Sequence, residues 1–66
     1  MSFAIKSIVD GYVSLKDRNS LEGLREHRQL LRRRVNDQAT EYFDVSRTIQ
    51  ILDEEIQVIE AGISQL

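Results

Sequence analysis

The chain has 66 residues, a formal net charge of −2, no cysteine and no proline. A single chain of this length buries too little apolar surface to be comfortably stable without a staple or a partner. The lack of cysteine excludes disulfides and thiolate metal sites, and the single histidine, His27, excludes a multi-histidine site within one chain. Oligomerisation is therefore the leading expectation, and residues 1–66 are predicted to form a single helical oligomerisation domain.

The first predicted element is a short helix over about residues 3–16. Ile5, Ile8, Tyr12 and Leu15 recur at helical spacing and fall on one stripe, and Phe3, Val9 and Val13 widen this apolar face. The segment is too short for a membrane span and lacks the basic start and cleavage site of a signal peptide. No membrane association is expected, and a cytoplasmic location follows by default.

The second predicted element is a long helix over about residues 20–66, with Asn19 or Ser20 as its N-terminal cap. Apolar residues recur along it in alternating steps of three and four, which is typical of a coiled-coil seam, and only Arg28 and Gln38 interrupt the pattern. At a rise of about 1.5 Å per residue this helix is roughly 70 Å long and needs a partner to cover its stripe. The apolar seam residues are Leu21, Leu24, Leu31, Val35, Tyr42, Val45, Ile49, Leu52, Ile56, Ile59, Ile63 and Leu66.

The charged edges of the seam predict an antiparallel coiled-coil homodimer. Basic residues precede the midpoint and acidic residues follow it, so antiparallel pairing brings opposite charges together, whereas parallel pairing makes no attractive pair. Exposed pairs contribute only about 0.2–1 kcal/mol each, so they select the orientation rather than hold the dimer together. The predicted pairs, formed twice about a two-fold axis between residues 43 and 44, are Arg25 with Glu60, Arg32 with Asp53 and Arg34 with Glu55.

A second apolar set beside the seam consists of Leu30, Ile51 and Val58. We expect the short helix to pack on these residues, which gives an all-α dimer with a short three-helix bundle at each end. Phe43, near the axis, is predicted to be a docking spot for a partner or a tetramer contact. A second topology stays open, because the polar residues 36–38 favour a turn that would fold the chain into a compact helical hairpin.

No sequence pattern supports catalysis, and neither a cofactor nor a metal is expected. We interpret the chain as a non-enzymatic structural, adaptor or regulatory protein that acts through coiled-coil self-association and contacts with a protein partner. The alternative is a nucleic-acid-associated regulator that binds phosphates through a basic cluster, although the net negative charge and the lack of interleaved aromatics weigh against it. The basic cluster consists of Arg25, Arg28, Arg32, Arg33 and Arg34.

Overall fold

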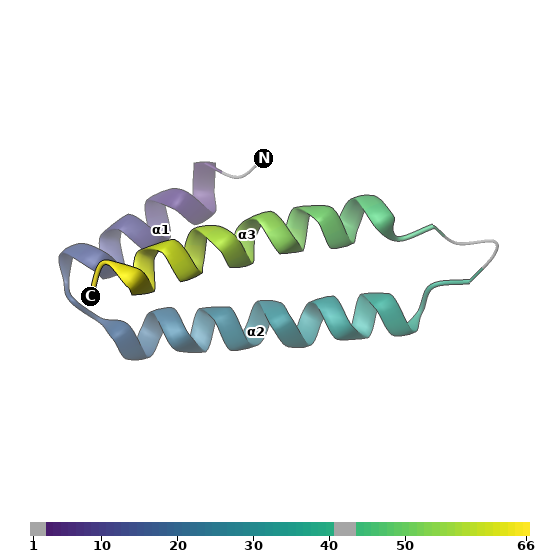
Figure 1. Ribbon diagram of the computed structural model, residues 1–66, viewed down its shortest axis with the longest axis horizontal. Coiled ribbons are helices and arrows are strands. Elements are labelled where there is room, and N and C mark those ends of the chain that lie inside the picture. The colour runs from purple at the N-terminus through teal and green to yellow at the C-terminus, as the bar shows by residue number, and fades with distance from the viewer. Residues whose placement is uncertain (1–2, 41–43) are drawn as a thin grey trace.

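Three α-helices make up the part of the chain that the computed structural model describes, residues 3–40 and 44–66. α1 spans Phe3–Ser14, α2 spans Arg18–Asp37 and α3 spans Ser46–Ser64. α2 and α3 run antiparallel as a helical hairpin, and α1 lies along the C-terminal half of α3 (Figure 1). The described residues form no strand, which confirms the all-α class.

The hairpin corrects the predicted continuous helix over residues 20–66. α2 ends at Asp37 and α3 begins at Ser46, so the chain reverses direction between them, just after the polar residues 36–38. The long axis of the molecule measures 43 Å, not the roughly 70 Å of an uninterrupted helix. The physical reason is that one chain can cover its own apolar stripe only by folding back on itself. The single chain thus adopts the alternative hairpin topology, but Asn36 and Asp37 are still helical and the chain turns after them.

Hydrogen bonds fix the connection between α1 and α2 both to the end of α1 and to the start of α2. Lys16 adopts a left-handed backbone with φ 55°, and the N–H groups of Lys16 and Asp17 donate back to the last turn of α1 at 3.0 and 2.9 Å. Asp17 then caps α2, because its carboxylate accepts from the backbone N–H of Ser20 at 3.1 Å and from its hydroxyl at 2.7 Å. The cap is Asp17 rather than the predicted Asn19 or Ser20.

Hydrogen bonds at two helix starts also change the acidity of the carboxyl groups that accept them. The pKa of Asp17 is lowered, first by the side-chain hydrogen bond from Ser20 and second by its backbone N–H. Asp44 accepts the backbone N–H of Ser46 at 2.9 Å, and this bond, with a smaller effect of the hydroxyl, lowers the pKa of Asp44. Both carboxylates therefore stabilise a helix start most strongly when they are ionised.

The core lies where the three helices meet. Leu21 of α2 and Ile59 of α3 are fully buried, one from each arm of the hairpin, and α1 closes over them. Burial of an aliphatic side chain of this size contributes about 1.5–3 kcal/mol, so this cluster is the main source of stability. The buried apolar residues of the described chain are Ile5, Val9, Leu21, Val45, Leu52, Ile59 and Ile63.

The buried face of α1 differs from the predicted stripe. Ile5 is buried as expected, but Ile8 is 45% and Leu15 75% exposed, and Val9, from the side of the predicted face, is buried. The cause is the close approach of α1 to α3 at Gly62: a Cβ there would fall inside van der Waals contact with Val9 and lie 3.4 Å from Val13. The contact with Gly62 turns the valines inward and leaves Ile8 facing solvent.

Candidate functional site: a charged edge and an open helix face

Ion pairs join the basic α2 to the acidic α3 along one edge of the hairpin. Nη1 of Arg25 lies 4.0 Å from Oε2 of Glu60, and Nε of Arg32 lies 2.6 Å from Oδ1 of Asp53. Two of the three pairings predicted from the sequence thus occur within one chain. The Arg25 and Glu60 side chains are 35% and 49% exposed, so this pair contributes at the level of surface ion pairs.

The third predicted pairing is replaced by another. Glu55 pairs with Arg28 instead of Arg34: Nε of Arg28 donates to Oε1 of Glu55 at 2.8 Å. Nη1 of Arg28 also lies 2.7 Å from Nδ1 of His27, within hydrogen-bonding distance. Because Arg28 occupies a seam position, its guanidinium reaches Glu55 directly, and both side chains are only about one-fifth exposed.

These contacts divide the basic cluster. Arg25, Arg28 and Arg32 each face an acidic partner on α3. Arg33 and Arg34 are exposed and form no ion pair with any residue that the structure describes. Arg33 and Arg34 are adjacent in the helix, so their Cα–Cβ bonds point about 100° apart.

The predicted seam residues lie mainly between the helices of one chain. Tyr42, predicted on the seam, and Phe43, predicted as a docking spot or tetramer contact, lie outside the described residues. The buried seam residues are Leu21, Val45, Leu52, Ile59 and Ile63, the half-buried ones are Leu24, Val35, Ile49 and Ile56, and the exposed ones are Leu31 and Leu66. The hairpin therefore uses within one chain the stripe that the sequence assigns to a dimer.

α1 covers only one end of α3. A cleft of about 110 Å³ between the two helices is lined by Lys6, Val9, Asp10, Val58, Ala61, Gly62 and Gln65. The stripe that contains Val58 and Ala61 continues toward the start of α3 in steps of three and four, through Glu54, Ile51 and Arg47. These last three residues, which we call the open face, lie beyond the part of α3 that α1 covers (Figure 1).

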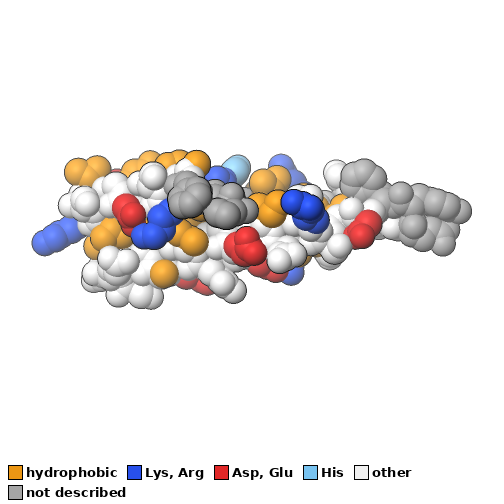
Figure 2. All heavy atoms as spheres, turned by 90° about the horizontal axis from the view of Figure 1, so that it is seen from above, with side chains coloured by type: hydrophobic (Ala, Val, Ile, Leu, Met, Phe, Trp, Pro, Cys, Tyr) orange, Lys and Arg blue, Asp and Glu red, His pale blue; other side chains and the backbone are white. Residues whose placement is uncertain are grey.

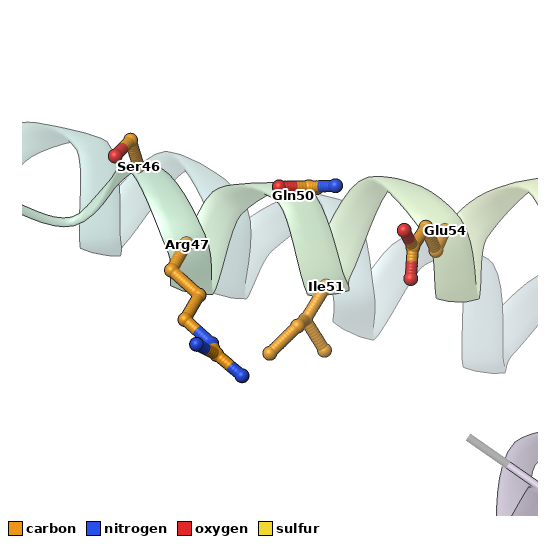
Figure 3. Close-up of a pocket in the computed structure, with 5 residues that line it drawn as sticks. All are labelled: Ser46, Arg47, Gln50, Ile51 and Glu54. Atoms are coloured by element: carbon orange, nitrogen blue, oxygen red, sulfur yellow. The ribbon is translucent and has the colours of Figure 1, made fainter. Parts of the chain in front are cut away.

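The surroundings of the open face are shallow. Ser46, Arg47, Gln50, Ile51 and Glu54 line an open depression of about 440 Å³, and all of them come from α3, so it has no opposing wall (Figure 3). Arg47 and Ile51 point to the same side of the helix. Small-molecule sites are concave and enclose most of their ligand. The depression at the open face therefore lacks the shape of a small-molecule site.

Two leucines of α2 also expose apolar surface. Leu30 is 42% exposed and Leu31 38%. Because Arg32 pairs with Asp53, these leucines lie opposite the part of α3 that follows Ile51. Figure 2 shows hydrophobic side chains gathered where α1 packs, and further ones between charged side chains along the remainder of the molecule.

The second apolar set, which the sequence predicts to receive α1, is thus only partly covered by that helix. Val58 packs against the core beside α1, whereas Leu30 and Ile51 stay 42% and 36% exposed. The reason is the position and length of α1, which the short connection to α2 and the contact with Gly62 hold at one end of the hairpin. Its 12 residues are about 18 Å long, too short to reach the other end.

Comparisons of the chain with family models, with curated proteins and with solved structures found no match. Within residues 3–40 and 44–66, no group of three or more His, Asp and Glu side chains is placed to hold a metal ion. No helix in this described part is long and apolar enough to cross a membrane. The candidate site is therefore a surface, the open face of α3.

Proposed function

We propose that the chain is a small non-enzymatic structural, adaptor or regulatory protein that acts through helix-to-helix association, with copies of itself and with other proteins. The observation that carries the proposal is the open face: α1 covers one end of the α3 stripe and leaves Arg47, Ile51 and Glu54 uncovered. An apolar centre between charged flanks is the surface that an amphipathic helix binds.

The small core supports self-association. Among the residues that the structure describes, Leu21 and Ile59 are the largest fully buried side chains, and a chain of 66 residues gains limited stability from a core of this size. Leu30, Leu31 and Ile51 keep 36–42% of their surface in water. Covering them with a partner recovers about 25 cal/mol for each Å² of apolar surface removed from water.

The antiparallel coiled-coil homodimer predicted from the sequence is a second form of the same proposal. The contacts between α2 and α3 have the same geometry whether both helices belong to one chain or to two. Opening of the hairpin between residues 38 and 45 would let two chains exchange α3 and keep the pairings of Arg25 with Glu60 and of Arg32 with Asp53. The two forms differ in length, since exchange produces a continuous helix.

Sedimentation equilibrium tests the proposal. The wild-type chain should pass from a mass of 7.7 kDa to twice that value as its concentration rises from micromolar to millimolar. Ile51→Glu, which places a charge in the centre of the open face, should shift the transition to higher concentration. Gln57→Glu, on the same helix but outside the stripe, is the matched control. A single mass of one chain over the whole range would refute self-association.

The exposed residues Arg33 and Arg34 support a second candidate, contact with the phosphates of RNA or DNA. The acidic partners of Arg28 and Arg32 compete with phosphate for those two arginines. Fluorescence anisotropy with a labelled single-stranded RNA measures such binding, which should weaken steeply with salt. Loss of binding in the Arg33→Ala, Arg34→Ala double variant would support this candidate, and no binding at low salt would remove it.

A further inference from the structure

We infer that the open face of α3 is the contact surface of a two-fold homodimer, in which the α3 helices of two copies pack antiparallel with Ile51 at the axis. This inference rests on the self-association that the proposed function contains and names the surface that carries it. The hairpin of each copy stays intact, so the dimer differs from the exchanged coiled coil described above.

The structure shows what the α3 stripe packs against. At the C-terminal end of α3 the stripe, through Val58 and Ala61, is covered by a helix, α1. Toward the N-terminal end, the same stripe presents Ile51, which is 36% exposed, and α1 does not extend over this end of α3 (Figure 1). α2, with 20 residues, is about 30 Å long and α1 about 18 Å, so roughly 12 Å of the hairpin has no third helix.

The charges on the open face select a second copy of the same helix. Arg47 lies one turn before Ile51, and Glu54 lies one turn after it. When two α3 helices cross antiparallel at Ile51, each Arg47 meets Glu54 of the second copy, so two attractive pairs form about the axis. A parallel arrangement would place Arg47 on Arg47 and Glu54 on Glu54. The face is therefore complementary to itself in one orientation.

The lengths of the helices also fit this arrangement. With Ile51 at the axis, Ser46 of the second copy lies over Ile56, so the partner α3 extends along the first α3 as far as this residue. α1 covers the same stripe from Val58 onward. α1 and the partner helix thus occupy successive parts of one stripe, and Asp44 and Val45 of the second copy, which precede its α3, lie next to the part that α1 covers.

Charge reversal tests the inference in the full chain. Arg47→Glu or Glu54→Arg alone places like charges together twice, and each should weaken dimerisation about tenfold in sedimentation equilibrium. The double variant Arg47→Glu, Glu54→Arg restores opposite charges and should return the dissociation constant to within about threefold of wild type. Arg33→Glu, an exposed reversal on α2, is the control and should leave dimerisation unchanged.

Cysteine cross-linking is a second test of the dimer contact, because the chain has no cysteine of its own. Ile51→Cys should form a disulfide-linked dimer under mild oxidation. Gln57→Cys should not, because the two residues stand 12 positions apart along the antiparallel helices, about 18 Å. The inference is wrong, and the proposed self-association still stands, if the chain dimerises but the charge reversals leave its dissociation constant unchanged. The same holds if the dimer does not cross-link through a cysteine at position 51. A chain that stays monomeric overturns the proposed self-association together with the inference.

Discussion

The contact between α1 and α3 makes a sharp prediction for Gly62→Ala. The new methyl group would fall inside van der Waals contact with Cγ1 of Val9 and 3.4 Å from Cγ2 of Val13. Both neighbours are β-branched and stiff about χ1, so α1 itself has to move. Overpacking of this kind costs about 1–3 kcal/mol. Replacing a helical glycine by alanine stabilises by up to about 1 kcal/mol, less in the last turn of a helix.

Gly23→Ala is the matched control. A methyl group at Gly23 meets nothing within 4 Å, so only the gain in helix propensity remains, about 0.5–1 kcal/mol. Urea unfolding followed by circular dichroism should therefore show Gly23→Ala to be more stable than wild type. Gly62→Ala should be less stable than Gly23→Ala by about 1–3 kcal/mol.

A double-mutant cycle shows whether the effect comes from α1. Val9→Ala removes the methyl groups that the new Cβ at Gly62 meets, so Gly62→Ala should cost little in the Val9→Ala background. The coupling between the two substitutions should reach about 1 kcal/mol or more. If Gly62→Ala and Gly23→Ala stabilise the chain equally, α1 does not pack on this glycine and the arrangement of the helices is wrong.

Three further predictions concern the core, the sheltered ion pair and the helix cap. Leu21→Ala should cost about 2–5 kcal/mol in urea unfolding because its side chain is fully buried, whereas Leu15→Ala, at a side chain 75% exposed, should cost less than about 0.5 kcal/mol. A cycle of Arg28→Gln and Glu55→Gln should give a coupling of about 1 kcal/mol that falls in high salt; equal values at low and high salt would contradict the pairing. Because the pKa of Asp17 is lowered in the folded chain, its contribution is present above the ordinary value of 3.8 and is lost as the pH falls through the folded value. Asp17→Asn should therefore flatten the acid side of the stability–pH curve, and an unchanged curve would remove this role.

The antiparallel pairing of α2 with α3 could be predicted from the sequence. Steps of three and four identify the stripe, and the position of basic and acidic residues on its edges sets the direction, as Arg32 and Asp53 show at 2.6 Å. Whether the two helices belong to one chain or to two is not contained in this periodicity. The same residues face each other in both cases, because the pattern is symmetric about the segment where the chain turns.

The position of α1 depends on information that the sequence pattern lacks. Ile8 and Val9 are both apolar, and only the close approach at Gly62 decides that Val9 is the residue that faces inward. Gly62 and Gly23 look alike in the sequence, since each lies near a helix end. The open face has a similar origin: Ile51 and Val58 stand at equivalent positions of α3, and the length of α1 determines which of them is covered.

The pairing of Glu55 shows why single charges are hard to assign. Arg28 and Arg34 both lie within reach of the α3 edge in a regular coiled coil. Arg28 forms the pair, with both side chains only about one-fifth exposed, because its position on the seam brings the guanidinium into the space between the helices. Long side chains can reach neighbouring positions, so edge charges specify the direction of pairing better than they specify individual partners.

Small-angle scattering combined with a mass measurement tests most directly whether the chain covers its own seam as a hairpin. One chain of 7.7 kDa should have a maximum dimension close to the 43 Å long axis. A dimer through the open face should remain about 45–50 Å long, since each hairpin extends about 15 residues beyond the axis. A rod of about 70 Å would show that α2 and α3 form one continuous helix, and both the hairpin and the open-face dimer would be contradicted.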